Sequence, residues 1–135
     1  MVENTSTIKQ LIREIKNIPF LKDNAILRDV IDIKEKFNFG TVVIVDKKNT
    51  VLGIVTDGDL RRIITKSQKH YSALMVESVI NFMNKDPIYL NHSNLSIDNI
   101  KEIFVSNKIL DIVVVDNDKC LKGIIHIHDI LEKYV

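Results

Sequence analysis

Short runs of apolar, largely β-branched residues recur along the chain and predict its strands. The first half of the chain contains two such runs, 41–45 and 51–55, and the second half contains two more, 112–115 and 121–125. In each half a polar stretch, DKKNT or DNDKC, separates the two runs and has the composition of a turn. We therefore predict one β-hairpin in each half of the chain.

Apolar residues with helical spacing lie before and after each predicted hairpin. The stripes that precede the hairpins are Val30, Ile33 and Phe37, and Ile100, Ile103 and Phe104. The stripes that follow them are Leu60, Ile63 and Ile64, and Ile130, Leu131 and Tyr134. We expect the charged residues of RDVIDIKEKF, Lys34 among them, on the solvated face of the first helix. A short extended piece with a proline, IPFL or DPIYL, precedes each first helix, so each half predicts strand, helix, hairpin and helix.

The two halves are copies of one unit. A shift of seventy residues places GTVVIVDKKNTVLGIVTDGD (40–59) over LDIVVVDNDKCLKGIIHIHD (110–129) without a gap, and the polar and apolar pattern agrees almost throughout. Self-similarity of this kind is typical of repeated supersecondary units, and a unit of about sixty residues buries little surface alone. We predict an α/β (α+β) fold in which two tandem β-α-β-β-α repeats pack together with pseudo-two-fold symmetry.

The repeat also predicts where the chain divides. The expected segments, in order, are an N-terminal segment (1–16), a first repeat (17–66), a linker (67–76) and a second repeat (77–135). The N-terminal segment is amphipathic, and the apolar residues that share one helical face in it are Ile8, Leu11, Ile12 and Ile15. We expect it to be either a packing helix or the end of a linker.

Composition excludes several classes of function. The 135 residues carry a formal net charge of +1, which argues against a duplex nucleic-acid binder and against a polybasic membrane surface. A single cysteine, Cys120, cannot form an internal disulfide, and the start of the chain lacks the apolar region of a signal peptide. We expect a cytoplasmic protein without a nucleic-acid or membrane partner.

The stretch GIVTDGDLRR joins a predicted strand to a predicted helix and allows two interpretations. Thr56 and Asp59 have the spacing of a capping box, and the helix dipole favours Asp57 and Asp59 in the first turn. That interpretation leaves Arg61 and Arg62 unexplained, because the dipole disfavours cations there. In the second interpretation the helix start, the hydroxyl and the arginines hold a phosphate or carboxylate, while Asp59 accepts ribose hydroxyls.

The second copy carries HIHD where the first carries TDGD. His126 and His128 can share one strand face, and imidazole suits zinc. Because no third ligand is evident nearby, we expect no metal, and favour a polar wall that contacts a phosphate or sugar acid. For His128 an ordinary surface position is favoured over that wall. Asp129 corresponds to Asp59. The sequence suggests no catalytic triad or Walker-type loop, so we expect no catalysis by this chain.

The order of elements, together with VVIVDKKNTVLGIVTDGDL, resembles a CBS domain, and two in tandem resemble a Bateman module over residues 17 to 135. The family pattern at this point is a strand, Ser or Thr, two residues, Asp and an apolar residue. The first copy fits it, whereas the second keeps Asp129 and replaces the hydroxyl. The resemblance implies that the aspartate contacts ribose and the hydroxyl residue contacts phosphate. It also implies that a base pocket is lined by backbone at Gly40 and Thr41, and at Leu110 and Asp111.

Three stretches, IPFLKDNAILRDVI, GIVTDGDLRR and LKGIIHIHDIL, narrow the resemblance to the CBS pair at the C-terminus of arabinose 5-phosphate isomerases. Those enzymes supply Kdo for bacterial lipopolysaccharide. The resemblance implies a regulatory piece without its sugar isomerase domain, hence not an enzyme, with CMP-Kdo as ligand. TDGDLRR also occurs in CBS pairs attached to sugar nucleotidyltransferases. An adenosine ligand such as AMP, ATP or S-adenosylmethionine is the family's general alternative.

A module that only dimerises is the third possibility. CBS pairs commonly form homodimers through their helices, and the residues that could supply such a face here are Ile63, Ile64, Ile130 and Leu131. In that case TDGD and HIHD are only helix caps.

Overall fold

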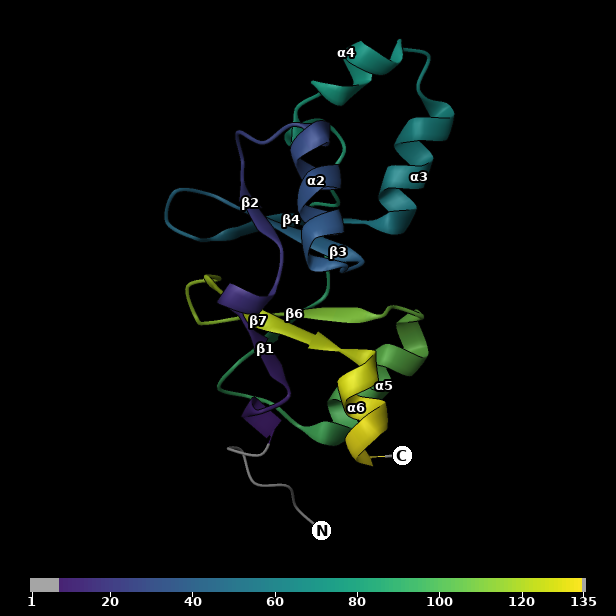
Figure 1. Ribbon diagram of the computed structural model, residues 1–135. Coiled ribbons are helices and arrows are strands. Elements are labelled where there is room, and N and C mark those ends of the chain that lie inside the picture. Colours follow the sequence, from purple (N-terminus) through teal and green to yellow (C-terminus); the bar gives the residue numbers. More distant parts are fainter. Residues whose placement is uncertain (1–7, 135) are drawn as a thin grey trace. The chain divides into compact units, whose positions relative to one another are not determined.

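The computed structural model describes residues 8–134 and divides the chain into two compact units (Figure 1). Unit 2 is continuous and comprises Lys16–Pro87, whereas unit 1 combines the chain up to Ile15 with the chain from Ile88 onward. Each unit has its own small sheet, its own helices and its own hydrophobic core. The predicted mixed fold of two strand, helix, hairpin and helix copies is confirmed.

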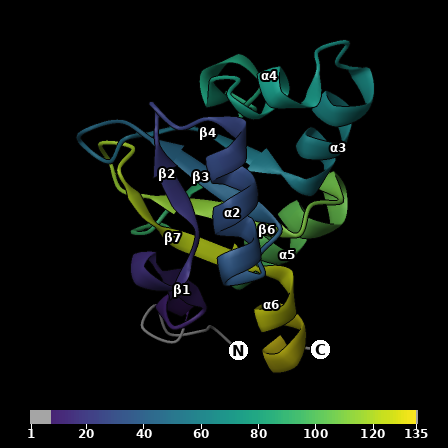
Figure 2. The same ribbon diagram turned by 45° about the horizontal axis from the view of Figure 1, so that its top comes forward.

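Unit 2 contains a three-stranded sheet in the order β2-β3-β4, with β2 parallel to β3 and β3 antiparallel to β4. Its elements are β2 (Phe20–Lys22), α2 (Leu27–Phe37), β3 (Thr41–Val45), β4 (Val51–Thr56), α3 (Asp57–Lys66), α4 (Tyr71–Met75) and the 3-10 helix η2 (Val79–Asn81). Helix α2 packs against β2 and β3 (Figure 2). All five residues of β3, the central strand of this sheet, are buried.

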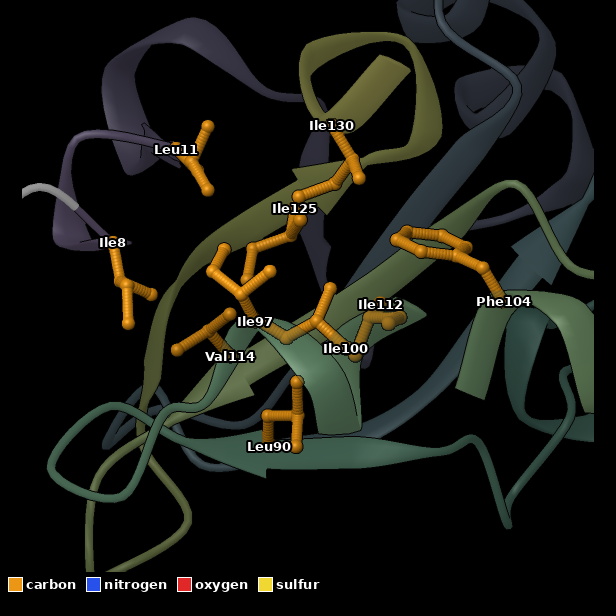
Figure 3. Close-up of a cluster of buried hydrophobic side chains, with 10 residues drawn as sticks. All are labelled: Ile8, Leu11, Leu90, Ile97, Ile100, Phe104, Ile112, Val114, Ile125 and Ile130. Atoms are coloured by element: carbon orange, nitrogen blue, oxygen red, sulfur yellow. The ribbon is translucent and has the colours of Figure 1, made fainter. Parts of the chain in front are cut away.

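Unit 1 contains a four-stranded sheet in the order β1-β7-β6-β5. Its elements are β1 (Ile12–Glu14), β5 (Tyr89–Asn91), α5 (Ile97–Asn107), β6 (Asp111–Val115), β7 (Leu121–His126) and α6 (Ile127–Tyr134), and a 3-10 turn, η1 (Ile15–Asn17), follows β1. Side chains of the strands, of α5 and of α6 meet in one apolar cluster (Figure 3). Ile8 and Leu11, far away in sequence, belong to the same cluster.

Each hairpin receives one further segment from the stretch that precedes the other copy. Strand β1 pairs antiparallel with β7, so that Arg13 lies opposite Ile124. In unit 2 a single bridge joins Asn84 to Ile54 in the same antiparallel sense. A glycine lies beside each of these segments, because a Cβ on Gly123 would be 2.3 Å from the Arg13 carbonyl oxygen and one on Gly53 would be 2.5 Å from that of Asn84.

The N-terminal segment (1–16) and the expected linker (67–76) both contain regular secondary structure. Within the described part of the amphipathic stretch at the front, Ile8 and Lys9 are helical, whereas Ile12–Glu14 is a strand on the edge of β7, so the predicted helical face does not extend over Ile12. The expected linker contains α4, whose Leu74 and Met75 are buried in the unit 2 core. The part of the N-terminal segment before residue 8 lies outside the described residues.

Candidate functional site

The start of α3 in unit 2 brings Thr56 and Asp59 together. Strand β4 runs directly into the helix, and Thr56 is its N-cap. The Asp59 amide donates to Thr56 Oγ1 at 3.2 Å, and the Thr56 amide donates to Asp59 Oδ2 at 2.8 Å. The Thr56 hydroxyl donates to the same carboxylate oxygen at 3.0 Å. The predicted capping box is confirmed, and it uses one of the two oxygens of Asp59.

The two arginines after the cap have different surroundings. Arg62 forms an ion pair with Asp59 Oδ1, one turn back on the same helix, with 56% of the Arg62 side chain exposed and 13% of the Asp59 side chain. Arg61 is exposed. More than half of the Arg62 side chain is exposed to solvent, so its guanidinium can exchange Asp59 for another partner at small cost.

Lys34 on α2 joins the same region and was not among the predicted site residues. Its ammonium donates to the Gly40 carbonyl at 2.6 Å and lies 2.6 Å from Asp57 Oδ1, while only 10% of the Lys34 side chain is exposed. The expectation that Lys34 lies on the solvated face is wrong. The signal was available, because Lys34 falls seven residues after Leu27 and four after Val30, on the buried face of α2.

The remaining predicted residues of unit 2 lie around this lysine. The Asp57 amide donates to the Gly40 carbonyl at 3.1 Å, and a Cβ on Gly40 would be 3.3 Å from Asp57 Oδ2. Thr41 is buried and lies opposite Thr56 in the hairpin. Unit 2 therefore gathers a hydroxyl, two carboxylates, an ammonium and a guanidinium where β4 meets α3.

In unit 1 the corresponding strand end carries a histidine and a carboxylate. Asp111 lies opposite His126 in the β6–β7 pair, and His126 Nδ1 is 2.6 Å from Asp111 Oδ1. The side chain of Asp111 is only 5% exposed. The ring centroid of His128 lies 5.6 Å from that of His126. Leu110 is 61% exposed, and its carbonyl accepts from the Ile127 amide at 2.9 Å.

Asp129, the counterpart of Asp59, is held by an arginine from the other end of the chain. Arg13 Nε donates to Asp129 Oδ2 at 2.8 Å, and Arg13 Nη2 donates to Oδ1 at 3.1 Å. This hydrogen-bonded carboxylate raises the pKa of Arg13 above its ordinary value, although burial acts in the opposite direction. Sequence reasoning did not identify Arg13, because no local pattern relates residues that far apart along the chain.

The structure also bears on metals, cavities and membranes. Within residues 8–134, no three His, Cys, Asp or Glu side chains gather where a metal ion could be held.

A hollow of about 530 Å³ in unit 1 is lined by none of the predicted residues. Its lining residues are Lys9, Gln10, Ile12, Glu14, His92 and Lys122. The described helices are all too short or too polar to cross a membrane.

Two units of the same strand, helix, hairpin and helix order define a tandem-repeat module, in which the second hairpin strand of each copy runs directly into a helix. The CBS domain family model matches residues 8–66 and 76–135. The chain belongs to the CBS domain family and contains a pair of these domains.

Curated relatives include proteins of several kinds. The chain is 31% identical over 128 residues to an uncharacterized protein of Rickettsia prowazekii, covering 95% of this chain and 38% of the relative. It is 30% identical over 113 residues to an inosine-5'-monophosphate dehydrogenase of Aquifex aeolicus, with coverages of 84% and 22%. It is 30% identical over 127 residues to the arabinose 5-phosphate isomerase KdsD of Francisella tularensis, with coverages of 93% and 36%. The chain thus spans less than two-fifths of the length of these relatives.

Solved structures with the same fold are more distant in sequence. CBSX2 in complex with AMP matches with a TM-score of 0.80 at 19% identity, over 93% of this chain and 92% of that chain. The CBS domain protein PAE2072 of Pyrobaculum aerophilum, complexed with AMP, matches with a TM-score of 0.74 at 19% identity, over 90% and 87%. These likenesses establish the fold.

Proposed function

We propose that this CBS pair is a non-catalytic, cytoplasmic regulatory module that binds a nucleotide or nucleotide-sugar at the start of α3. The observation that carries the proposal is the grouping of the Thr56 hydroxyl, the Asp59 carboxylate and the Arg62 guanidinium within one helical turn. In this proposal Asp59 accepts the ribose hydroxyls, as acidic residues do in dinucleotide folds. Thr56 and Arg62 then face the phosphate, since Arg62 can leave Asp59 at small cost.

Two classes of ligand are candidates for this site. CMP-Kdo follows from the resemblance to the CBS pair of arabinose 5-phosphate isomerases and from the 30% identity to the Francisella enzyme. Its phosphate and sugar-acid carboxylate suit the arginine pair, Arg61 and Arg62. An adenosine nucleotide is the alternative, supported by two structural neighbours that are described in complex with AMP.

The regulated activity in this proposal is that of an arabinose 5-phosphate isomerase, with CMP-Kdo as the feedback signal from the same pathway. A ligand changes a partner's activity only if it binds one conformation more tightly than another. The regulatory contact would therefore be made by the helices next to the ligand, and α3 begins at the site itself.

A ligand-free dimerisation module remains the competing account. Ile64 on α3 and Leu131 on α6 are 50% and 45% exposed and could contribute to a homodimer face. Ile130 cannot contribute, because it is 3% exposed and belongs to the unit 1 core, so that part of the predicted face is corrected.

Thermal unfolding in the presence of CMP-Kdo, CMP, AMP, ATP and S-adenosylmethionine tests the proposal. A ligand that binds only the folded chain stabilises it by about 2.7 kcal/mol at a hundredfold excess over its dissociation constant. A higher midpoint with CMP-Kdo alone supports the link to Kdo synthesis, and one with AMP or ATP supports adenosine sensing. No shift with any of the five contradicts the proposed function and favours dimerisation alone.

Asp59→Asn is the matching variant for the site. The amide keeps the shape of the side chain but can no longer accept hydrogen bonds through two charged oxygens, so nucleotide binding should be lost. The weakened cap should cost about 0.5–2 kcal/mol of stability. Unchanged affinity together with lower stability would return Asp59 to a purely structural role.

A further inference from the structure

We propose that Arg13 occupies the ribose-accepting carboxylate of unit 1, so that the chain binds one nucleotide, in unit 2, and not one in each repeat. The inference rests on the proposed function and specifies how the two repeats share it. It makes Arg13 the residue that determines which repeat is open to ligand.

The geometry of Asp129 carries the argument. Both of its carboxylate oxygens accept from the Arg13 guanidinium, at 2.8 and 3.1 Å, in the two-point arrangement that is the strongest for this pair of groups. A ribose would have to direct its two hydroxyls at the same oxygens. Because the guanidinium already satisfies them with charge-assisted bonds, neutral hydroxyls are poor competitors.

The placement of the arginine makes it difficult to displace. Arg13 is in the middle of β1, which is paired with β7 through Ile12, Arg13 and Glu14. In unit 2 the partner of Asp59 is Arg62, which lies on the same helix and is 56% exposed, against 36% for Arg13. An arginine held by a strand loses less freedom on pairing than one at an exposed helix surface, so the Arg13–Asp129 pair should persist when ligand is present.

The equivalent position in unit 2 holds an asparagine. Asn84 pairs with Ile54 as Arg13 pairs with Ile124, and the seventy-residue shift relates Ile54 to Ile124. The side-chain oxygen of Asn84 accepts from the Asp86 amide at 3.0 Å, within its own turn. One register position therefore carries an arginine that covers the aspartate in unit 1 and a short amide directed elsewhere in unit 2.

A second difference between the two units also favours a single nucleotide site, in unit 2. The hydroxyl that caps α3 in unit 2 is replaced in unit 1 by His126, whose ring nitrogen is 2.6 Å from the nearly buried Asp111. Unit 1 thus lacks the Thr56 equivalent that would face a phosphate, and the imidazole in its place already has a carboxylate partner. In unit 1 the partners of these two groups, Asp111 and Arg13, come from other strands, whereas in unit 2 Thr56, Asp59 and Arg62 pair among themselves at the start of one helix.

Isothermal titration of the whole chain with AMP and, separately, with CMP-Kdo tests the inference. The wild type should bind about one nucleotide per chain, Asp59→Asn should abolish that binding, and Asp129→Asn should leave it unchanged. A stoichiometry of two, or loss of binding in Asp129→Asn with binding kept in Asp59→Asn, overturns the inference and leaves the proposed function standing. Absence of binding to the wild type contradicts the proposed function itself.

Exchanging the two register residues provides the matched pair of variants. Arg13→Asn gives unit 1 the residue of unit 2 and should add a second, weaker binding event. Asn84→Arg gives unit 2 the residue of unit 1 and should weaken the first event by about tenfold or more. Unchanged affinity in a folded Asn84→Arg chain, as judged by its thermal transition, would overturn the inference even if Arg13→Asn failed to fold.

Discussion

The side chain of Lys34 connects helix α2 to the candidate site where β4 meets α3. Its ammonium links the Gly40 carbonyl to the Asp57 carboxylate, although nearly all of the side chain is buried. A buried ammonium is tolerated only where it is paired and hydrogen-bonded, and here it has both kinds of partner. Lys34 therefore fixes α2, the start of β3 and the start of α3 relative to one another within unit 2.

Replacement of Lys34 by Met keeps the apolar stem and removes the charge. We expect Lys34→Met to lower the free energy of unfolding by about 1–2 kcal/mol, because Gly40 and Asp57 lose a charge-assisted partner. Chemical denaturation measures the change. Lys36→Met, on the exposed face of the same helix, is the control and should stay within about 0.5 kcal/mol of the wild type. Equal effects of the two substitutions would remove Lys34 from this role.

The parts of the site that sequence could predict are those that lie within one turn of chain. Thr56 and Asp59 could be predicted as a cap because these two residues, which bond to each other, are only three positions apart in the sequence. The partner of Asp129 was not, because Arg13 is 116 residues away and reaches it only through the pairing of β1 with β7. Residue contacts of that range follow from the fold and not from a local pattern.

At the scale of elements, the hairpin strands could be predicted from their own residues, whereas strand β1 could not. The β-branched runs and polar turns predicted β3, β4, β6 and β7 nearly to the residue. Ile8, Leu11 and Ile12 have helical spacing, and two of them are buried as an amphipathic pattern suggests, yet Ile12 is extended. The open edge of β7 decides this outcome, because it offers backbone hydrogen bonds that override a weak local preference.

The close approach of β1 to β7 can be tested at Gly123. A Cβ there would be 2.3 Å from the Arg13 carbonyl oxygen and 2.5 Å from Ile12 Cγ2, so Gly123→Ala must push the two strands apart. We expect a loss of about 1–3 kcal/mol in the free energy of unfolding. Gly58→Ala is the control, because its nearest neighbour is the flexible end of Arg62 at 3.4 Å. It should be neutral or slightly stabilising in thermal denaturation.

The hairpin turns of the two units should make the stability of the protein depend on pH. Backbone amides bind the carboxylates of Asp46 and Asp116, chiefly those of Thr50 and Cys120, and lower the pKa of each aspartate below its ordinary value. The folded form of each turn therefore binds its proton less readily than the unfolded chain. The stabilisation is complete above the ordinary aspartate pKa and is lost as pH falls through the lowered value.

We accordingly expect the unfolding midpoint to fall as the solution is acidified below about pH 4. Part of that dependence should disappear in Asp46→Asn and in Asp116→Asn, because an amide does not titrate. Thermal unfolding at a series of pH values measures both effects. A pH dependence identical to that of the wild type in both variants would contradict the assignment to these turns.

At the scale of the whole molecule, the boundaries of the two units are not those of the two sequence repeats. The first repeat ends near residue 66, but the core of unit 2 also takes Leu74, Met75 and Val79 from the following segment. The Asn84–Ile54 bridge adds one more contact from beyond the repeat. A fragment cut at the repeat boundaries therefore loses buried apolar groups and leaves an edge of β4 uncovered.

Two fragments distinguish these boundaries. A fragment of residues 16–87 retains the whole unit 2 core, so we expect a cooperative thermal transition even though a domain of this size is marginal. A fragment of residues 17–66 loses three core side chains, each contributing roughly 1.5–3 kcal/mol through burial, and the total loss is comparable with the whole stability expected of so small a domain. Circular dichroism on heating should show a transition for the first fragment and a gradual change for the second. Cooperative unfolding of 17–66 would instead make the sequence repeat the folding unit, and the segment that contains α4 would then be a dispensable connection.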